Sequence, residues 1–409
     1  MKSTPSLIKI IYFFLFPLLL AYPNKLFEGT YINYIYIFVC FGLSLFLNRN
    51  KSFQSNKIIS FFWWLFLLVL VANVFSSVLS YNIDISDYIA STLRYLSFFI
   101  LTLFLFISTK SKHDFLFWIK SFLLGFSLSL IIIVLDSYKI GFIEPTFKIT
   151  TFESQETLDI YFRAYGAYLS PISAGVFLLN TFVIVNTTML YINFKRWTST
   201  FLYCILFLII ICIFMTASRT ALLGLFIYLL LIALKSKNRI KILIIFLIAG
   251  VFIYYSGIID VYLDNILLRN ERESEISNNL LEGSGRIDTF FNSLKLYLDW
   301  RTLFFGVGPS EYSEGDDLYS FAHNGFLSLI LCYGLLGVIC FLNLLSFIYS
   351  KIATNTVSKK IFIDYISVNA VCFITSDGPV TYFWIVNFIV FLFFIYKFNY
   401  IKDVNVNFR

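Results

Sequence analysis

Apolar residues dominate the chain in long runs, and short polar stretches separate one run from the next. About 20 consecutive apolar residues cross the hydrocarbon core of a bilayer as one helix. The runs therefore predict an all-α polytopic membrane protein with about twelve transmembrane helices. The pair 199–216 and 220–234 fits either two tilted spans or a partly re-entrant hairpin, because its second run is short. The predicted spans are residues 6–23, 30–47, 58–80, 92–109, 117–135, 168–192, 199–216, 220–234, 242–259, 325–349, 361–376 and 380–396.

The distribution of charge assigns each loop to one side of the membrane. With the N-terminus in the cytoplasm, the inner side collects 20 of the 31 Lys and Arg residues, in clusters such as residues 235–241. The same side holds only 3 of the 24 acidic residues, which are Asp114, Asp364 and Asp403. Short basic loops mark the cytoplasmic face of a membrane protein. The sequence therefore predicts that both termini are cytoplasmic.

The composition agrees with this topology and excludes several classes of protein. The 409 residues are 59% hydrophobic and 13% charged, and their mean hydropathy is +0.82. A soluble domain is about half apolar and a quarter charged, so a cytosolic globular enzyme, a nucleic-acid-binding domain and a disordered scaffold are excluded. The basic inner loops account for the net charge of +7 without any nucleic acid as a partner.

We expect residues 1–409 to form a single membrane-embedded domain with two sizeable outer loops. The first loop covers residues 136–167, and the second, larger and helical loop covers residues 260–324. The inner loops are short, and the chain has no GxxxxGK[ST] motif, which excludes an ATP-driven pump acting as a single chain.

The outer arginines are the candidate functional residues, because they oppose the overall charge bias. Arg219 lies in the tight connection between two apolar runs, in the segment Thr216-Ala217-Ser218-Arg219-Thr220. A charge so close to hydrocarbon is unfavourable unless it meets a partner or a cavity. Arg219 therefore either anchors an anionic group at the outer membrane boundary or extends its charge toward water as an interfacial arginine.

Arg286 follows the turn Gly283-Ser284-Gly285 at the start of a helical pattern that runs through residues 287–298. Ser284 is a natural N-cap, and the flanking glycines let backbone amides approach a ligand. An arginine in the first turn of a helix adds positive charge to an end that already attracts anions. The motif favours a phosphate site, although a solvated helix lying on the membrane fits the same pattern.

His323 and Arg163 complete the candidate set. His323 is the outer-face histidine at the start of the span 325–349, and its ordinary pKa of about 6.5 suits a general base for a sugar hydroxyl. Arg163 lies where the first outer loop meets the span 168–192, and an interfacial role fits it equally well. The acidic pair Asp316 and Asp317 lacks the spacing of metal ligands, so we predict no metal.

Four segments together carry a resemblance to the O-antigen polymerase and O-antigen ligase superfamily. Residues 217–224, ASRTALLG, resemble its SRT-type segment, and residues 284–288 with 304–309, SGRID and FFGVGP, resemble a stretch in its large periplasmic loop. Residues 322–327 with 333–337, AHNGFL and YGLLG, are similar to its motif at the start of a late span. Residues 163–171 give a weaker fourth match.

The resemblance implies a glycosyltransferase of the bacterial inner membrane whose active face is periplasmic. Its donor would be an oligosaccharide linked to undecaprenyl diphosphate within the membrane lipid. Arg219 and Arg286 would bind the diphosphate, with Arg163 as a third cation, and His323 would activate or orient the acceptor hydroxyl. Direct attack on the anomeric carbon would invert its configuration, and neither a metal nor another cofactor is implied.

Polymerases and ligases of this superfamily use the same donor and differ in the acceptor. The two-loop layout, with Arg163 in one loop and Arg286 in the other, favours a polymerase, which also allows for a chain-length regulator protein as a partner. The combination of arginines with His323 is what ligases are noted for, and a ligase would transfer the glycan to lipid A-core. A lipid-linked glycan flippase or transporter is a further alternative, which the large loop 260–324 disfavours.

Overall fold

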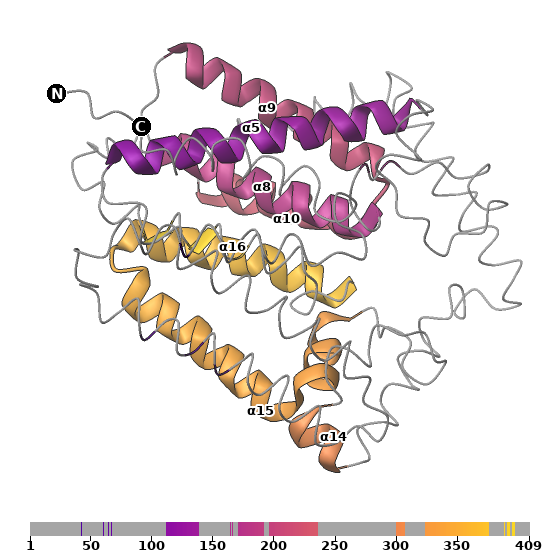
Figure 1. The fold of residues 1–409 in the computed structure, drawn as a ribbon, viewed down its shortest axis with the longest axis vertical. Helices are drawn as coiled ribbons and strands as arrows, with labels where there is room; N and C mark the ends of the chain where they lie inside the picture. The colour runs from indigo at the N-terminus through magenta and orange to yellow at the C-terminus, as the bar shows by residue number, and fades with distance from the viewer. Residues whose placement is uncertain are drawn as a thin grey trace, which may run out of the picture.

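The computed structural model describes residues 112–138, 171–191, 196–235, 300–306 and 324–375, with single residues elsewhere, among them Ala164 and Gly166. These described residues form helices and turns and contain no strand. The helices are α5 (Lys112–Ser137), α8 (Pro171–Tyr191), α9 (Arg196–Met215), α10 (Arg219–Lys235), α14 (Trp300–Phe305), α15 (Gly325–Phe347) and α16 (Thr356–Thr375), and a π-helical turn (Ile348–Ile352) follows α15 (Figure 1).

Six of the predicted spans coincide with α5, α8, α9, α10, α15 and α16, and their ends differ by a few residues. Among the described residues, three segments are long and apolar enough to cross a membrane, namely Phe117–Ser137, Arg196–Met215 and Tyr333–Ile352, and Ala174–Thr187 is a shorter apolar helix. These findings identify a helical membrane protein. The other six predicted spans lie wholly or largely outside the described residues, so the count of twelve stays a prediction.

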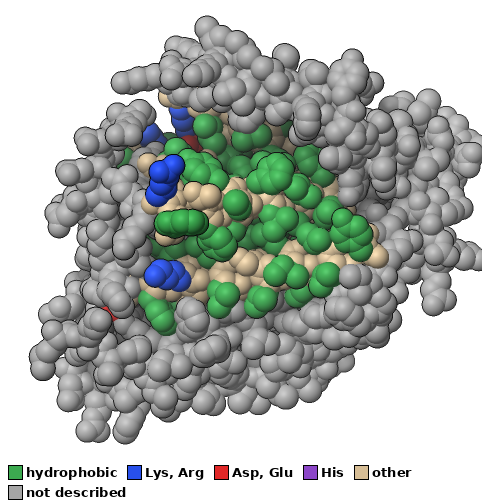
Figure 2. All heavy atoms as spheres, turned by 90° about the horizontal axis from the view of Figure 1, so that it is seen from above, with side chains coloured by type: hydrophobic (Ala, Val, Ile, Leu, Met, Phe, Trp, Pro, Cys, Tyr) green, Lys and Arg blue, Asp and Glu red, His purple; other side chains and the backbone are tan. Residues whose placement is uncertain are grey.

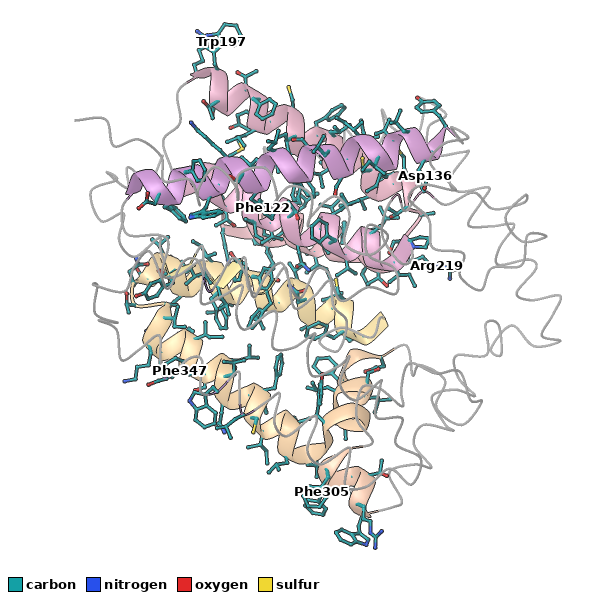
Figure 3. The ribbon with its side chains drawn as sticks, viewed as in Figure 1. Phe122, Asp136, Trp197, Arg219, Phe305 and Phe347 are labelled. Carbon is teal, nitrogen blue, oxygen red and sulfur yellow. The ribbon has the colours of Figure 1, made fainter. Side chains whose placement is uncertain are left out.

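The pair of apolar runs 199–216 and 220–234 forms two separate helices, α9 and α10, which are joined by a tight turn. α9 has 20 residues and α10 has 17, and at 1.5 Å per residue α10 is about 25 Å long. Asp136, at the end of α5, and Arg219, at the start of α10, lie at one end of the bundle, whereas Trp197 and Phe347 lie at the other end (Figure 3). This alternation is the one that the charge pattern predicts for successive spans.

The helices pack in layers that bring distant parts of the chain together (Figure 1). α5 contacts α9, and α8 contacts α9, α10 and α16. α16 also contacts α10 and α15, and the short helix α14 lies against α15. α8 and α16 are therefore the central elements, and α10 lies between them.

Burial follows helical periodicity, but the outward faces of the helices are also apolar. In α9 the buried face includes Leu202, Ile205 and Ile209, whereas Tyr203 and Phe207 are exposed. Figure 2 shows a broad hydrophobic surface on the face of the molecule that it views, with the basic side chains gathered toward one edge. A helix that is apolar on all sides is typical of a membrane span, and basic residues at one edge are typical of its cytoplasmic end.

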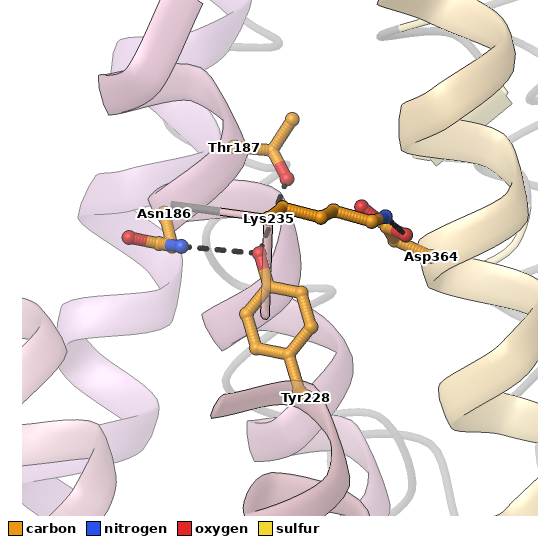
Figure 4. Close-up of polar contacts among 5 residues, drawn as sticks. All are labelled: Asn186, Thr187, Tyr228, Lys235 and Asp364. Atoms are coloured by element: carbon orange, nitrogen blue, oxygen red, sulfur yellow. Dashed lines mark hydrogen bonds and ion pairs between the residues drawn. The ribbon is translucent and has the colours of Figure 1, made fainter. Parts of the chain in front are cut away.

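Polar contacts connect the helices near that basic end (Figure 4). Lys235 at the end of α10 forms an ion pair with Asp364 of α16. The Tyr228 hydroxyl of α10 accepts a hydrogen bond from the Asn186 side-chain amide of α8 at 3.1 Å. Both partners of the ion pair belong to the charges that the sequence assigns to the cytoplasm, so the contact agrees with the predicted orientation.

Two glycines allow α8, α10 and α16 to approach closely at the other half of the bundle. A Cβ atom at Gly175 of α8 would lie 2.7 Å from the Ser218 Cβ and 2.8 Å from the Ala221 Cβ. A Cβ atom at Gly224 of α10 would lie 2.4 Å from Cδ2 of Leu179. Small residues are frequent at helix contacts in membranes because they let backbones approach.

We expect Gly175→Ala to destabilise the protein by about 1–3 kcal/mol, because atoms fixed to the backbone must move. Gly224→Ala is the matched control, and it should be milder because the closest atom is the end of the Leu179 side chain and not an atom fixed to the backbone. Thermal unfolding of the purified variants in detergent measures both effects. A larger loss of stability for Gly224→Ala would contradict this account of the packing.

Candidate functional site

The turn between α9 and α10 holds Arg219 in place. The Thr216 N–H bonds to the Cys212 carbonyl at 3.0 Å, and the Thr216 hydroxyl donates to the Ile213 carbonyl at 2.7 Å, so α9 ends in a closed turn. Ala217 then adopts a left-handed φ of +47°, which is strained for a residue with a Cβ atom. The chain thus reverses within three buried residues, Thr216, Ala217 and Ser218.

Ser218 caps α10 and makes Arg219 the first residue of that helix. The Ser218 Oγ accepts a hydrogen bond from the Ala221 N–H at 3.4 Å, and its carbonyl accepts the first intrahelical bond, from Leu222, at 3.0 Å. Arg219 is exposed although both of its neighbours are buried. The guanidinium therefore adds to the positive end of the helix dipole, an arrangement that suits an anion.

The end of the first outer loop is attached beside this turn. The Ala164 N–H bonds to the carbonyl of Met215, the last residue of α9, at 3.1 Å. The Gly166 N–H bonds to Oδ2 of Asp136, in the last turn of α5, at 3.0 Å. Ala164, Gly166 and Asp136 are all buried. Arg163 itself lies outside the described residues, but it is covalently bonded to Ala164.

Asp136 did not emerge from the sequence as a candidate. Its only signal is that an acidic residue directly follows the apolar run 117–135, where it opposes the dipole at the C-terminus of a helix. Since the contact to Gly166 spans 30 residues, local patterning could not reveal it. Only the structure therefore identifies Asp136 as a neighbour of the α9–α10 turn.

The start of α15 lies at the same end of the bundle as Arg219. α16 runs antiparallel to α10, because Gly224 lies against Cys372 and Lys235 pairs with Asp364. The C-terminal end of α16 in turn contacts the start of α15, where the rings of Phe326 and Phe373 meet edge-to-face at 5.8 Å. The first turns of α10 and α15 therefore flank the same end of α16.

Asn324 caps α15 and thereby sets the chain direction at this point. Its Oδ1 atom accepts hydrogen bonds from the N–H groups of Phe326 at 3.1 Å and Leu327 at 3.2 Å. His323, its covalent neighbour, lies outside the described residues. Arg286 lies outside them as well, as do most of the loops 136–167 and 260–324. The convergence of these residues on Arg219 thus stays a prediction.

Two of the glycine-rich motifs contact each other at a bend in α15. Gly334 has a φ of +64°, and a Cβ atom there would lie 2.3 Å from both the carbonyl carbon and the carbonyl oxygen of Phe304 in α14. No other residue type fits a left-handed position against a backbone without strain. The motifs 304–309 and 333–337 therefore meet through this close approach.

The described part of the chain contains no group of three His, Cys, Asp or Glu side chains that could hold a metal ion. At the Arg219 end of the bundle, the described residues supply a cation, helix N-terminal amides and capping oxygens. Such groups bind and orient anions and hydroxyls.

Residues 204–342 match a family model described as O-Antigen ligase. The match begins in α9 and ends in α15, and it includes Arg219, Arg286 and His323. It confirms the resemblance to the O-antigen polymerase and ligase superfamily, whose members are membrane enzymes of the glycosyltransferase kind. No curated protein matches the chain at a significant level.

The capping role of Asn324 gives a direct test. Asn324→Ala should lower stability by about 1 kcal/mol, because two N–H groups lose their acceptor. Asn324→Asp should retain most of the stability, since a carboxylate caps a helix equally well. Thermal unfolding in detergent compares the two variants. Equal losses of stability in both would contradict a capping role.

Proposed function

Starting from the superfamily that residues 204–342 match, we propose that the protein is a repeat-unit polymerase of O-antigen. It takes an oligosaccharide from an undecaprenyl-diphosphate carrier and transfers it to a hydroxyl of another lipid-linked repeat unit. The observation that carries this proposal is the exposed Arg219 at the capped N-terminus of α10. Arg219 lies at the same end of the bundle as Ala164, which belongs to the first large loop, and Asn324, which caps α15.

The reaction needs little more than charge stabilisation and a base. The acceptor hydroxyl oxygen attacks the anomeric carbon, the bond from that carbon to the diphosphate oxygen breaks, and the configuration inverts. His323 receives the hydroxyl proton. Arg219 and Arg286 stabilise the negative charge that develops on the leaving undecaprenyl diphosphate, and Arg163 adds a third positive charge. The transfer then needs no metal ion and no nucleotide sugar.

The position of the site favours a lipid-linked diphosphate. Arg219 is the first residue of the apolar helix α10 and follows the end of the apolar helix α9 by four residues, so its guanidinium lies at the level of lipid headgroups in our topology. The diphosphate of a polyprenyl carrier lies at that level, while its hydrocarbon tail remains in the bilayer. The basic edge at the opposite end of the bundle supports a position of this site on the periplasmic face of the inner membrane, because basic residues favour the cytoplasmic side.

A ligase that transfers the glycan to lipid A-core is the second candidate, and the description of the matched family favours it. Deletion of the gene in its own organism separates the two candidates. Loss of a polymerase leaves a single repeat attached to the core, whereas loss of a ligase leaves the core bare while lipid-linked polymer accumulates. An unchanged surface glycan would contradict both and favour a transporter.

Arg219→Ala should reduce glycan transfer by about 10²-fold or more, because a donor to the leaving group is lost. Arg286→Ala and His323→Ala should cause losses of transfer at least as large. Arg219→Lys should restore little activity, since an ammonium group lacks the two-pronged geometry of a guanidinium. The assay follows extension of a lipid-linked repeat unit by the purified protein.

Arg196 provides the matched control for Arg219. It is also an exposed arginine at the first residue of a helix, α9. Its neighbour Trp197 lies at the end of the bundle opposite Arg219 (Figure 3). Arg196→Ala should therefore leave transfer within about twofold of the unmodified protein, on the rule that distant surface changes have small effects. If the two alanine variants lose activity equally, Arg219 has no special role.

A further inference from the structure

Asp136 occupies a position that a carboxylate normally avoids. It lies in the last turn of α5, where the helix dipole disfavours negative charge, and its exposed fraction is only 2%. Burial of a carboxylate is unfavourable unless polar partners compensate it. One partner is the Gly166 N–H, whose nitrogen lies 3.0 Å from Oδ2. A contact of this kind, between a charged acceptor and a backbone donor, is stronger than a neutral hydrogen bond.

Gly166 is suited to this contact by its lack of a side chain. Its φ is +56°, and a Cβ atom would lie 3.1 Å from Cγ2 of Ile132 and 3.1 Å from Cγ1 of Ile133. Gly166 therefore lies directly against the last turns of α5. A larger residue would move the N–H away from the carboxylate.

Ala164, two residues before Gly166, contacts the start of the α9–α10 turn. Ala164 is 1% exposed, and its N–H bonds to the Met215 carbonyl at 3.1 Å. Met215 ends α9 and precedes Arg219 by four residues. We call this set, Asp136, Gly166, Ala164 and Met215, the Asp136 clasp. It connects the end of α5 to the turn that carries Arg219 and to the peptide that follows Arg163.

We infer that Asp136 is a positioning residue for binding of the donor diphosphate, an inference that rests on the proposed function. By holding Gly166, the carboxylate fixes the end of the first outer loop against the α9–α10 turn. Arg219 is thereby presented to the diphosphate in one orientation, together with the chain that carries Arg163. Asp136 is buried and does not touch the substrate, so its effect falls on substrate binding rather than on the bond-breaking step.

The test uses full-length protein in lipid nanodiscs and undecaprenyl diphosphate as the probe. Asp136→Ala should weaken binding of the probe at least tenfold and raise KM for the lipid-linked donor by a similar factor, with a smaller change in kcat. Asp136→Asn should bind within about threefold of the unmodified protein, because its amide oxygen accepts the Gly166 N–H from the same place. Equal losses for the two variants would overturn the inference.

Asp364→Asn is the matched control, since it removes a carboxylate that pairs with Lys235 at the opposite end of the bundle. It should lower thermal stability without changing affinity for the probe. If it weakens binding as much as Asp136→Ala does, loss of stability explains both effects and the inference fails. If Asp136→Ala does not fold, Gly166→Ala replaces it, and unchanged binding by that variant would overturn the inference.

Arg219→Ala in the same assay separates the inference from the proposed function. If Arg219→Ala binds the probe weakly and Asp136→Ala binds it normally, the proposed function is supported and the positioning role of Asp136 is overturned. Failure of the unmodified protein to bind undecaprenyl diphosphate would overturn both the proposed function and the inference.

A disulfide between cysteines introduced at Ala164 and Met215, in a background without the native cysteines, reports on the Asp136 clasp directly. It should form readily in the parent and slowly in Asp136→Ala.

Discussion

The Arg219 end of this bundle is organised around one unfavourable placement, a guanidinium at the N-terminus of the apolar helix α10. Arg219 adds positive charge where the dipole of α10 is already positive, and its neighbours Ser218 and Thr220 are buried. A closed turn after α9 and a serine cap on α10 hold it there. Such a placement is favourable when an anion is bound, and this is the physical basis of our proposal that the site binds a lipid diphosphate.

Much of the recognisable sequence around the site has a structural rather than a chemical role. Ser218 and Asn324 are helix caps, and Gly334 permits the contact between α14 and the bend of α15. Gly175 lets α8 approach the start of α10. These residues determine where the chemically competent side chains lie. The short motifs therefore describe a scaffold that presents a cation, an amide-rich helix end and the start of α15 on one side of the membrane.

The sequence predicted the described helices well, because membrane spans need uninterrupted apolar runs and their ends carry charge. It also identified Arg219, since a charge between two such runs stands out. It missed Asp136, whose contact with Gly166 depends on packing between segments 30 residues apart. It also left open whether the pair 199–216 and 220–234 forms two tilted spans or a partly re-entrant hairpin. The structure has two helices there, joined by the three-residue turn through Ala217, and their passage across the membrane stays a prediction.

The central claim is that the residues around the start of α10 bind the diphosphate of a polyprenyl carrier. An electron cryomicroscopy structure of the protein in nanodiscs with undecaprenyl diphosphate tests it most directly. We expect the diphosphate beside the first turn of α10, with the Arg219 guanidinium at about 2.7–2.9 Å from a phosphate oxygen and His323 facing the acceptor side. A diphosphate bound at the Trp197 end of the bundle, or density far from Arg219, would contradict the account.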